Sequence, residues 1–210
     1  MKPAVPPPVL AALAAALTML QPVSAAQTDP PAPRWTQRWV FSQAVAGWTL
    51  QAAGPGADAA WADGALRLTA ALQVGPQGQL SCPVAEARTA FGDATTRQGG
   101  DRWLRLTLQV RRWDLGLGHL DDHVPLLEVV HHGERTVLGV AGFTRMPDQV
   151  ELRWDAGRGW RAVYGGQERT LQPRSVRADR SAPGLRLWTD GCSQGMRQAL
   201  ELTALGVAAG

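Results

Sequence analysis

Residues 102–113 read RWLRLTLQVRRW. Leucine and valine occupy every second position from Leu104 to Val110, and arginine, threonine and glutamine stand between them. Alternation with period two over eight residues is typical of a β-strand that buries one face and exposes the other. This stretch therefore predicts a half-buried strand, and the rest of the chain shows how often such strands recur.

Comparable patterns predict further strands at 38–42, 47–52, 65–74, 79–82, 124–131, 136–143, 149–154, 160–164, 168–171, 185–189 and 197–207. Turn signals such as Asp63-Gly64 and Gly165-Gly166 separate them. One segment, 84–90, is compatible with a short helix whose exposed side would carry Glu86 and Arg88.

Many short strands with closely spaced turns indicate a sandwich or a barrel. We expect an all-β fold, in the form of a two-sheet antiparallel jelly-roll β-sandwich. The residues expected on its inner faces are Leu66, Leu68, Leu104, Leu106, Leu108, Val110, Leu185, Leu187, Leu200 and Leu202.

The N-terminal segment has the pattern of an export signal. Lys2 precedes an apolar run of twelve residues from Val9 to Leu20, and small residues end at Ala25. Such a run is too short for a transmembrane helix and suits a secretory signal. We expect a signal peptide at 1–25, a proline-rich linker at 26–34 and one folded domain at 35–210. The alternative is an uncleaved anchor or a disordered tail.

Charge gives no support to a nucleic-acid partner. Removal of Lys2, the only lysine, leaves 20 arginines against 18 acidic residues, a net charge of +2. The arginines are scattered, whereas nucleic-acid sites concentrate basic charge on one face. We therefore expect no nucleic-acid partner and, once the signal is removed, no membrane span.

The chain has two cysteines, Cys82 and Cys192. Export would place them in an oxidising compartment, where an even number of cysteines favours a disulfide. We expect these two to pair, and the alternative is two buried free thiols.

Short motifs at both ends of the domain resemble one known superfamily. Phe41 is followed by GWT at 47–49 and by DGALRL at 63–68, and residues 185–191 and 200–203 form a strand, a turn and a closing strand. This order resembles the concanavalin A-like lectin/glucanase superfamily. The resemblance implies a jelly roll whose closing strand pairs beside the first strand.

The glucanase members of that superfamily carry acidic residues at alternate positions of one strand. Retaining hydrolysis needs two carboxyl groups about 5 Å apart. Here Glu128 stands alone on its strand, and Arg153 lies between Glu151 and Asp155, where we expect it to neutralise both. The glucanase pattern is therefore absent.

Nine tryptophans, against three phenylalanines and one tyrosine, are the strongest anomaly of the composition. Trp103 shares its strand face with Arg105 and Gln109, and Trp188 shares its face with Asp190. An aromatic ring beside fixed polar groups suits sugar binding, so we expect these five residues to bind the ligand. The alternative is that loops cover these faces or that the rings lie on a convex surface. The tryptophans expected in the core are Trp48, Trp61 and Trp154.

Histidines and acidic residues cluster in one segment, although their spacing matches no strong zinc motif. The residues of that cluster are His119, Asp121, Asp122 and His123. We expect them in a solvated loop, and we expect His131-His132, which precede Gly133, to be exposed at a strand end. The final strand lacks the aspartate of a calcium site. We therefore expect no metal and no cofactor.

These observations predict an exported, non-catalytic, carbohydrate-binding protein of lectin-like β-sandwich type, in the periplasm or outside the cell, with a glycan as its partner. Two alternatives remain open. One is a jelly-roll polysaccharide lyase or hydrolase, with His119 or Tyr164 as the base. The other is a structural or assembly protein of the cell envelope.

Overall fold

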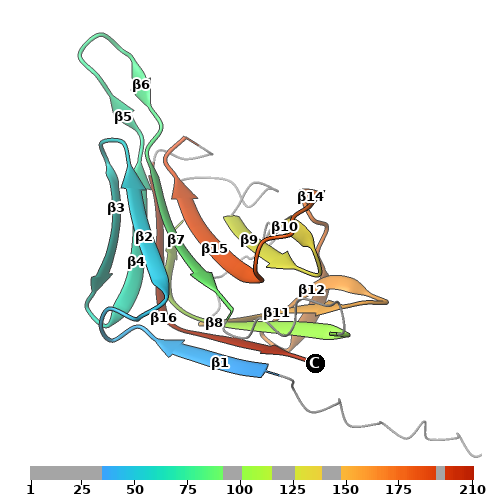
Figure 1. Ribbon diagram of the computed structural model, residues 1–210. Coiled ribbons are helices and arrows are strands. Elements are labelled where there is room, and N and C mark those ends of the chain that lie inside the picture. Colours follow the sequence, from blue (N-terminus) through green and yellow to red (C-terminus); the bar gives the residue numbers. More distant parts are fainter. Residues whose placement is uncertain (1–34, 92–100, 115–125, 139–147, 193–196) are drawn as a thin grey trace, which may run out of the picture. The chain divides into compact units, whose positions relative to one another are not determined.

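The computed structural model describes residues 35–91, 101–114, 126–138, 148–192 and 197–210. Within these ranges the chain forms strands and turns and no helix, which confirms the predicted all-β class. Two antiparallel sheets pack face to face as a β-sandwich of jelly-roll type, and a short hairpin forms a separate two-stranded sheet (Figure 1). The predicted signal peptide and linker lie outside the described residues.

The larger sheet, here called sheet A, contains eight strands. Seven follow one another in the order β13 (Gln167–Thr170), β12 (Gly159–Tyr164), β11 (Gln149–Asp155), β8 (Trp103–Asp114), β16 (Arg197–Ala209), β4 (Ala65–Ala71) and β3 (Ala57–Ala62). The eighth, β1 (Trp35–Val40), pairs with β16.

Strand β16 has a different neighbour in each half. Its first half, to Leu202, pairs with β4, and its second half, from Ala204, pairs with β1. On its other edge it pairs with β8, and the register shifts between Glu201 and Ala204. A β-bulge of this kind bends a strand, which lets one long strand serve two neighbours. The prediction that the closing strand pairs beside the first is confirmed.

The smaller sheet, sheet B, contains six strands. Their order is β14 (Ser175–Ala178), β10 (Glu134–Leu138), β9 (Leu126–His131), β15 (Gly184–Asp190), β7 (Val84–Ala90) and β2 (Trp48–Ala53). The remaining hairpin joins β5 (Gln73–Val74) and β6 (Leu80–Ser81).

Strand β7 corrects one prediction, because the segment compatible with a helix is a strand. It pairs with β15 on one side and β2 on the other. Ala85 and Ala87 are fully buried on its inner face, so pairing and packing override the helix propensity of alanine. Strands β3 and β14 were not predicted, and the predicted strand ends at 124–125 and 139–143 lie outside the described residues.

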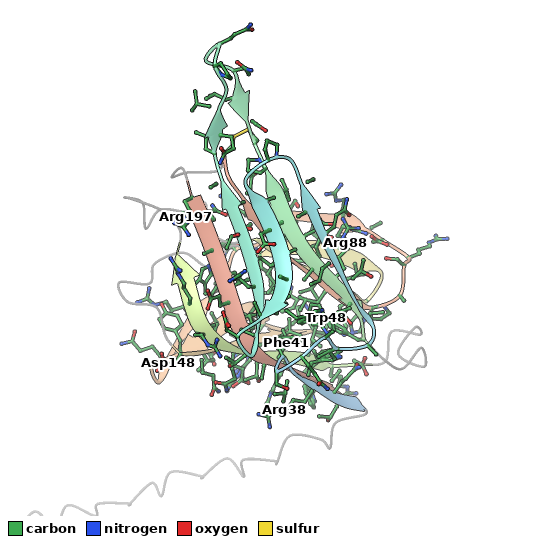
Figure 2. All side chains as sticks on the ribbon, turned by 90° about the vertical axis from the view of Figure 1, so that its left-hand side faces the viewer. Arg38, Phe41, Trp48, Arg88, Asp148 and Arg197 are labelled. Atoms are coloured by element: carbon green, nitrogen blue, oxygen red, sulfur yellow. A yellow bond between two sulfur atoms is a disulfide. The ribbon has the colours of Figure 1, made fainter. Side chains whose placement is uncertain are left out.

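The core lies between the inner faces of the two sheets. All ten leucines and valines predicted on these faces are buried. Trp48, Trp61 and Trp154 are partly buried and pack against the core, as predicted. Phe41 is fully buried, and Figure 2 shows it beside Trp48. Its ring centroid lies 5.3 Å from that of Trp48 and 5.5 Å from that of Trp61. This aromatic group fills the core beside the end of β1.

Cys82 and Cys192 form a disulfide with Cα atoms 5.0 Å apart, which confirms the predicted pairing. Cys82 precedes β7 and Cys192 follows β15, and these two strands are neighbours in sheet B. The bond therefore ties together strand ends that the sheet already places side by side.

Candidate functional site

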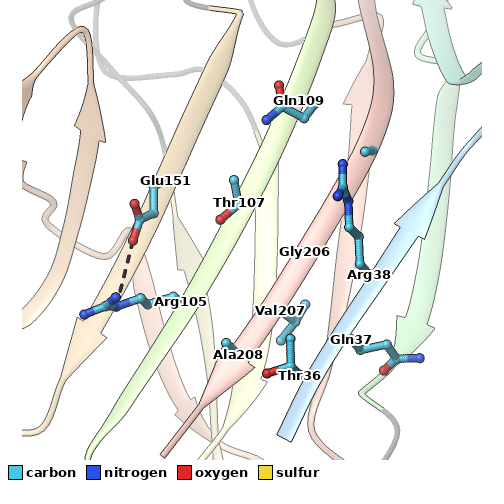
Figure 3. A pocket seen from close by; sticks show the side chains of 11 residues that line it. Thr36, Gln37, Arg38, Arg105, Thr107, Gln109, Glu151, Gly206, Val207 and Ala208 are labelled. Carbon is cyan, nitrogen blue, oxygen red and sulfur yellow. Dashed lines mark ion pairs between the residues drawn. The ribbon is translucent and has the colours of Figure 1, made fainter. Parts of the chain in front are cut away.

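A hollow of about 440 Å³ lies on the outer face of sheet A (Figure 3). Its lining residues come from β1, β8, β11 and β16, and they are Thr36, Gln37, Arg38, Arg105, Thr107, Gln109, Glu151, Ala204, Gly206, Val207 and Ala208. This volume is within the usual range of small-molecule sites, about 300–1,000 Å³.

The pairing of strands explains why the hollow forms. Alternate residues of β16 that face outward are small: Ala204, Gly206 and Ala208. Arg105, Thr107 and Gln109 stand opposite them on β8, whereas Thr36 and Arg38 stand opposite Ala208 and Gly206 on β1. A column of small residues therefore forms the floor between two walls of longer polar side chains. At about 3.3 Å per residue, this floor is about 13 Å long.

Gly206 is the centre of the floor. A Cβ atom at this position would come no closer than 3.8 Å to another heavy atom, the Cβ of Thr107, which is an ordinary contact. A side chain at this position would therefore begin without a clash. Figure 3 shows Arg38 and Arg105 on either side of this glycine.

The side chains that line the hollow carry more positive than negative charge. Glu151 is the acidic residue of the lining, and its carboxylate accepts hydrogen bonds from Arg153 Nε at 2.8 Å and Nη2 at 3.2 Å. These hydrogen bonds to Glu151 are the main cause of the raised pKa of Arg153. Arg105 Nε lies 3.9 Å from Glu151 Oε1, and Arg38 forms no ion pair with a described residue. The lining thus carries two arginines against one carboxylate, and Arg38 supplies the excess positive charge that favours an anionic group.

Ion pairs continue on the same face beside the hollow. Arg153 also lies 3.4 Å from Glu168, and Arg161 pairs with Glu168 at 2.5 Å and with Asp155. The prediction that Arg153 neutralises Glu151 is confirmed. Asp155 is instead paired with Arg161, which comes from the next strand in the sheet.

The position of Trp103 does not suit the sugar stacking that the sequence predicts for it. The residue is only 8% exposed, and its ring packs against the backbone of Gly210. The guanidinium carbon of Arg105 lies 5.1 Å from the ring centroid. A ring covered in this way offers little surface to a sugar, but it supports Arg105 at the wall of the hollow.

Trp188 and Asp190 belong to sheet B, so they do not join the other three predicted ligand residues in one site. Trp188 is half-buried, with the guanidinium of Arg186 4.6 Å from its ring centroid. Asp190 Oδ1 accepts a hydrogen bond from the backbone N–H of Cys192 at 2.8 Å. This contact fixes the turn that carries the disulfide.

Two buried carboxylates lie on the outer face of sheet B. The predicted exposure of Glu86 is wrong, whereas Glu128 is the one acidic residue of β9, as the sequence indicates. Glu86 is 5% exposed and pairs with Arg88 at 2.7 Å and Arg186 at 2.5 Å. Glu128 is equally buried and pairs with Arg135 at 2.6 Å. Burial alone would raise the pKa of Glu86, but hydrogen bonds from the two arginines hold it below its ordinary value. The two arginines therefore hold Glu86 in its ionised form.

Asp101, His131 and His132 form a second candidate site, and the predicted exposure of the two histidines is wrong. Their potential ligand atoms lie within 4.8 Å of one another. His131 is 6% exposed and His132 is half-buried, because the Trp154 ring packs 5.0 Å and 4.7 Å from their ring centroids. Burial, and secondly His132, lowers the pKa of His131 to about 3, although Asp101 Oδ2 lies 3.8 Å from its Nε2. The His131 imidazole is thus neutral at physiological pH.

The other candidate residues are placed as follows. The cluster of His119, Asp121, Asp122 and His123 lies outside the described residues. Tyr164 packs against the core, with the guanidinium of Arg169 5.3 Å from its ring centroid. The core and Arg169 therefore fix the Tyr164 ring at the end of β12.

No known protein family and no curated protein matches the chain. Among solved structures, the chain is similar to the winged bean acidic lectin in its complex with methyl-α-D-galactose. The two are 10% identical with a TM-score of 0.44, and the match covers 83% of this chain and 98% of that chain. That lectin has the concanavalin A-like fold. At this identity and TM-score the likeness identifies no residue of a binding site.

Proposed function

We propose that this protein is exported and binds acidic glycans, without altering them, in the hollow of sheet A. The observation that carries the proposal is the floor of Ala204, Gly206 and Ala208 between walls of polar side chains. A sugar ring has apolar C–H faces and a rim of hydroxyl groups. The small residues would contact the ring face, and the wall residues would bond to its rim.

The wall residues determine the class of sugar. Gln109 and Thr107 can both donate to and accept from hydroxyl groups. Arg38 and Arg105 donate several N–H groups in a planar arrangement that matches a carboxylate. Two arginines on opposite sides of the floor therefore favour a sugar that carries a carboxylate, such as a uronate. Trp103 would act indirectly, because it supports Arg105 from below.

Export is the second part of the proposal. The Cys82–Cys192 disulfide is typical of proteins from oxidising compartments. Residues 1–25 would be the signal peptide and 26–34 the linker that precedes the domain. In the part of the chain that the structure describes, no helix is long and apolar enough to span a membrane.

Binding is proposed in preference to catalysis because of the lining. A lyase that acts on uronates needs a base near the sugar, and a histidine or tyrosine is the usual choice. The described lining residues include neither. The alternative of an envelope assembly protein would leave the two arginines of the hollow without a role.

The test is calorimetric titration of the protein with oligogalacturonate and with its methyl ester, which lacks the negative charge. We expect binding of the acid and much weaker binding of the ester. A hydrogen bond to a charged group contributes about 1.5–3 kcal/mol, so Arg38→Gln and Arg105→Gln should each weaken binding about ten- to a hundredfold. Arg177→Gln, which removes an exposed arginine of sheet B, is the matched control. Equal affinity for acid and ester would contradict the proposed class of ligand.

A further inference from the structure

Potential metal ligands from both sheets meet beside Trp154, away from the hollow. Asp101 lies two residues before the start of β8 in sheet A, whereas His131 ends β9 of sheet B and His132 begins the turn to β10. Residues 30 positions apart in the chain thus converge through the packing of the two sheets. The cluster is independent of the proposed glycan site, because it shares no residue with the lining of the hollow.

The backbone turns both histidine rings to the same side. Successive side chains of a strand point to opposite faces, but His132 has a φ of 54° and Gly133 a φ of 72°. These values suit the two central positions of a type I′ hairpin turn, where asparagine or aspartate followed by glycine is favoured. Asp63 and Gly64, with φ values of 52° and 72°, occupy the equivalent turn between β3 and β4. An asparagine would therefore satisfy the turn, so the turn alone does not explain the imidazole of His132.

The surroundings of the histidine ring nitrogens point to a bound ligand. The Nε2 atoms of His131 and His132 are both buried, and neither has a hydrogen-bond partner among the described residues. A buried polar atom without a partner costs free energy, and such an atom calls for an explanation. The ring centroids lie 4.2 Å apart, and each residue of the cluster offers one potential ligand atom within 4.8 Å of the others.

We propose that Asp101, His131 and His132 bind a divalent transition-metal ion of the zinc type. Imidazole nitrogen is a preferred ligand of zinc and related ions, whereas calcium and magnesium prefer oxygen. Two histidines and one carboxylate are a common set of three protein ligands, with the fourth position left to water. Ligand atoms around tetrahedral zinc are about 3.3 Å apart, so small side-chain rotations would close the present spacing.

The placement also determines what the ion would do. It would link the start of β8 in sheet A to the β9–β10 turn in sheet B, and thereby hold the two sheets together. His132 is half-buried, so the site lies close enough to the surface for an ion to enter. Trp154 would form the apolar wall.

The test uses the full-length protein without a histidine tag, freed of metal by a chelator. Titration with Zn²⁺ should give one bound ion per chain and a raised Tm, whereas Ca²⁺ and Mg²⁺ should change neither. His132→Asn keeps the turn chemistry and removes the ligand, so it should abolish both effects. Asp63→Asn, which introduces the same residue in the equivalent turn, should leave them intact. Binding of Zn²⁺ that survives His132→Asn would overturn the proposal.

Two further measurements cover the other histidines and the risk of misfolding. The chain has four histidines, and a double variant of the remaining two, His119→Asn with His123→Asn, should still bind the ion. If the double variant lost Zn²⁺ binding and His132→Asn kept it, the ion would bind elsewhere and the proposed site would be refuted. If His132→Asn does not fold, imidazole ¹⁵N NMR of the unmodified protein decides. Zn²⁺ should shift the ring nitrogens of His131 and His132, and unchanged signals would overturn the proposal.

Discussion

Removal of the Cys82–Cys192 disulfide should destabilise the protein strongly while leaving the fold intact. The bond closes a loop with a sequence separation of 110 residues. Loop-closure entropy for this length corresponds to about 5 kcal/mol at 25 °C. Free energies of unfolding are about 5–15 kcal/mol, so this is a large share of the total. For a chain of this size it corresponds to a fall in Tm of about 10–20 °C.

The native structure should survive because other contacts already hold the bridged ends. Strands β7 and β15 pair from Val84 to Ala90, and the N–H of Gly191 donates to the carbonyl of Pro83 at 2.9 Å. The effect of the bond therefore falls mainly on the unfolded chain, which becomes less restricted without it.

Urea unfolding followed by tryptophan fluorescence would measure this. The double variant Cys82→Ser with Cys192→Ser should unfold at lower urea than the oxidised protein and should not respond to dithiothreitol. Both cysteines are exposed, so the reductant should bring the unsubstituted protein to the same midpoint. A double variant within about 1 kcal/mol of the oxidised protein would refute the reasoning.

Three further changes have definite expected outcomes. Phe41→Ala removes a fully buried ring and should cost about 3–5 kcal/mol in urea unfolding; a loss below about 1 kcal/mol would contradict the packing. Hydrogen bonds from Ser181, and then from Arg135, lower the pKa of Asp179 from 3.8 to about 2. Its stabilising effect is therefore present above pH 3.8 and lost as the pH falls towards 2, and Asp179→Asn should flatten the fall of Tm across that interval. Trp188→Ala should leave oligogalacturonate binding unchanged, because Trp188 lies on sheet B; a weakened affinity would move the site to that face.

Much of the fold follows from strand periodicity. The alternation around Leu104 to Val110 places one side of β8 in the core, and the closing strand beside the first follows from the resemblance in motifs. Strand β7 could not be predicted in this way, because alanine, glutamate and arginine favour a helix when they stand alone. Its position between two other strands decides its conformation, and that position is a long-range property.

The walls of the hollow were partly predictable. Arg105 and Gln109 alternate with buried leucines, so their outward direction follows from the sequence. Arg38 and Gly206 did not stand out, because the hollow depends on the register that sets β1 beside β16. The sequence also gives no sign that Gly210 lies against the Trp103 ring, so the outward direction of this side chain does not mean that it is exposed.

The histidine cluster shows the same limit of local patterns. His131-His132 before a glycine has the pattern of a polar turn, and solvent exposure is the ordinary expectation for such a turn. The structure differs because Trp154, from a strand of the opposite sheet, packs against both rings. Contacts between sheets are not visible in a sequence of residues.

The central claim is that a glycan lies along the floor of the hollow, and one variant tests it most directly. Gly206→Leu fills the floor, and the nearest heavy atom to its Cβ would be 3.8 Å away, so the strand should not be disturbed. The variant should keep the circular dichroism spectrum and Tm of the unsubstituted protein and lose its affinity for oligogalacturonate. Unchanged affinity in a folded Gly206→Leu protein would contradict the account and place the glycan, if one binds, elsewhere on the molecule.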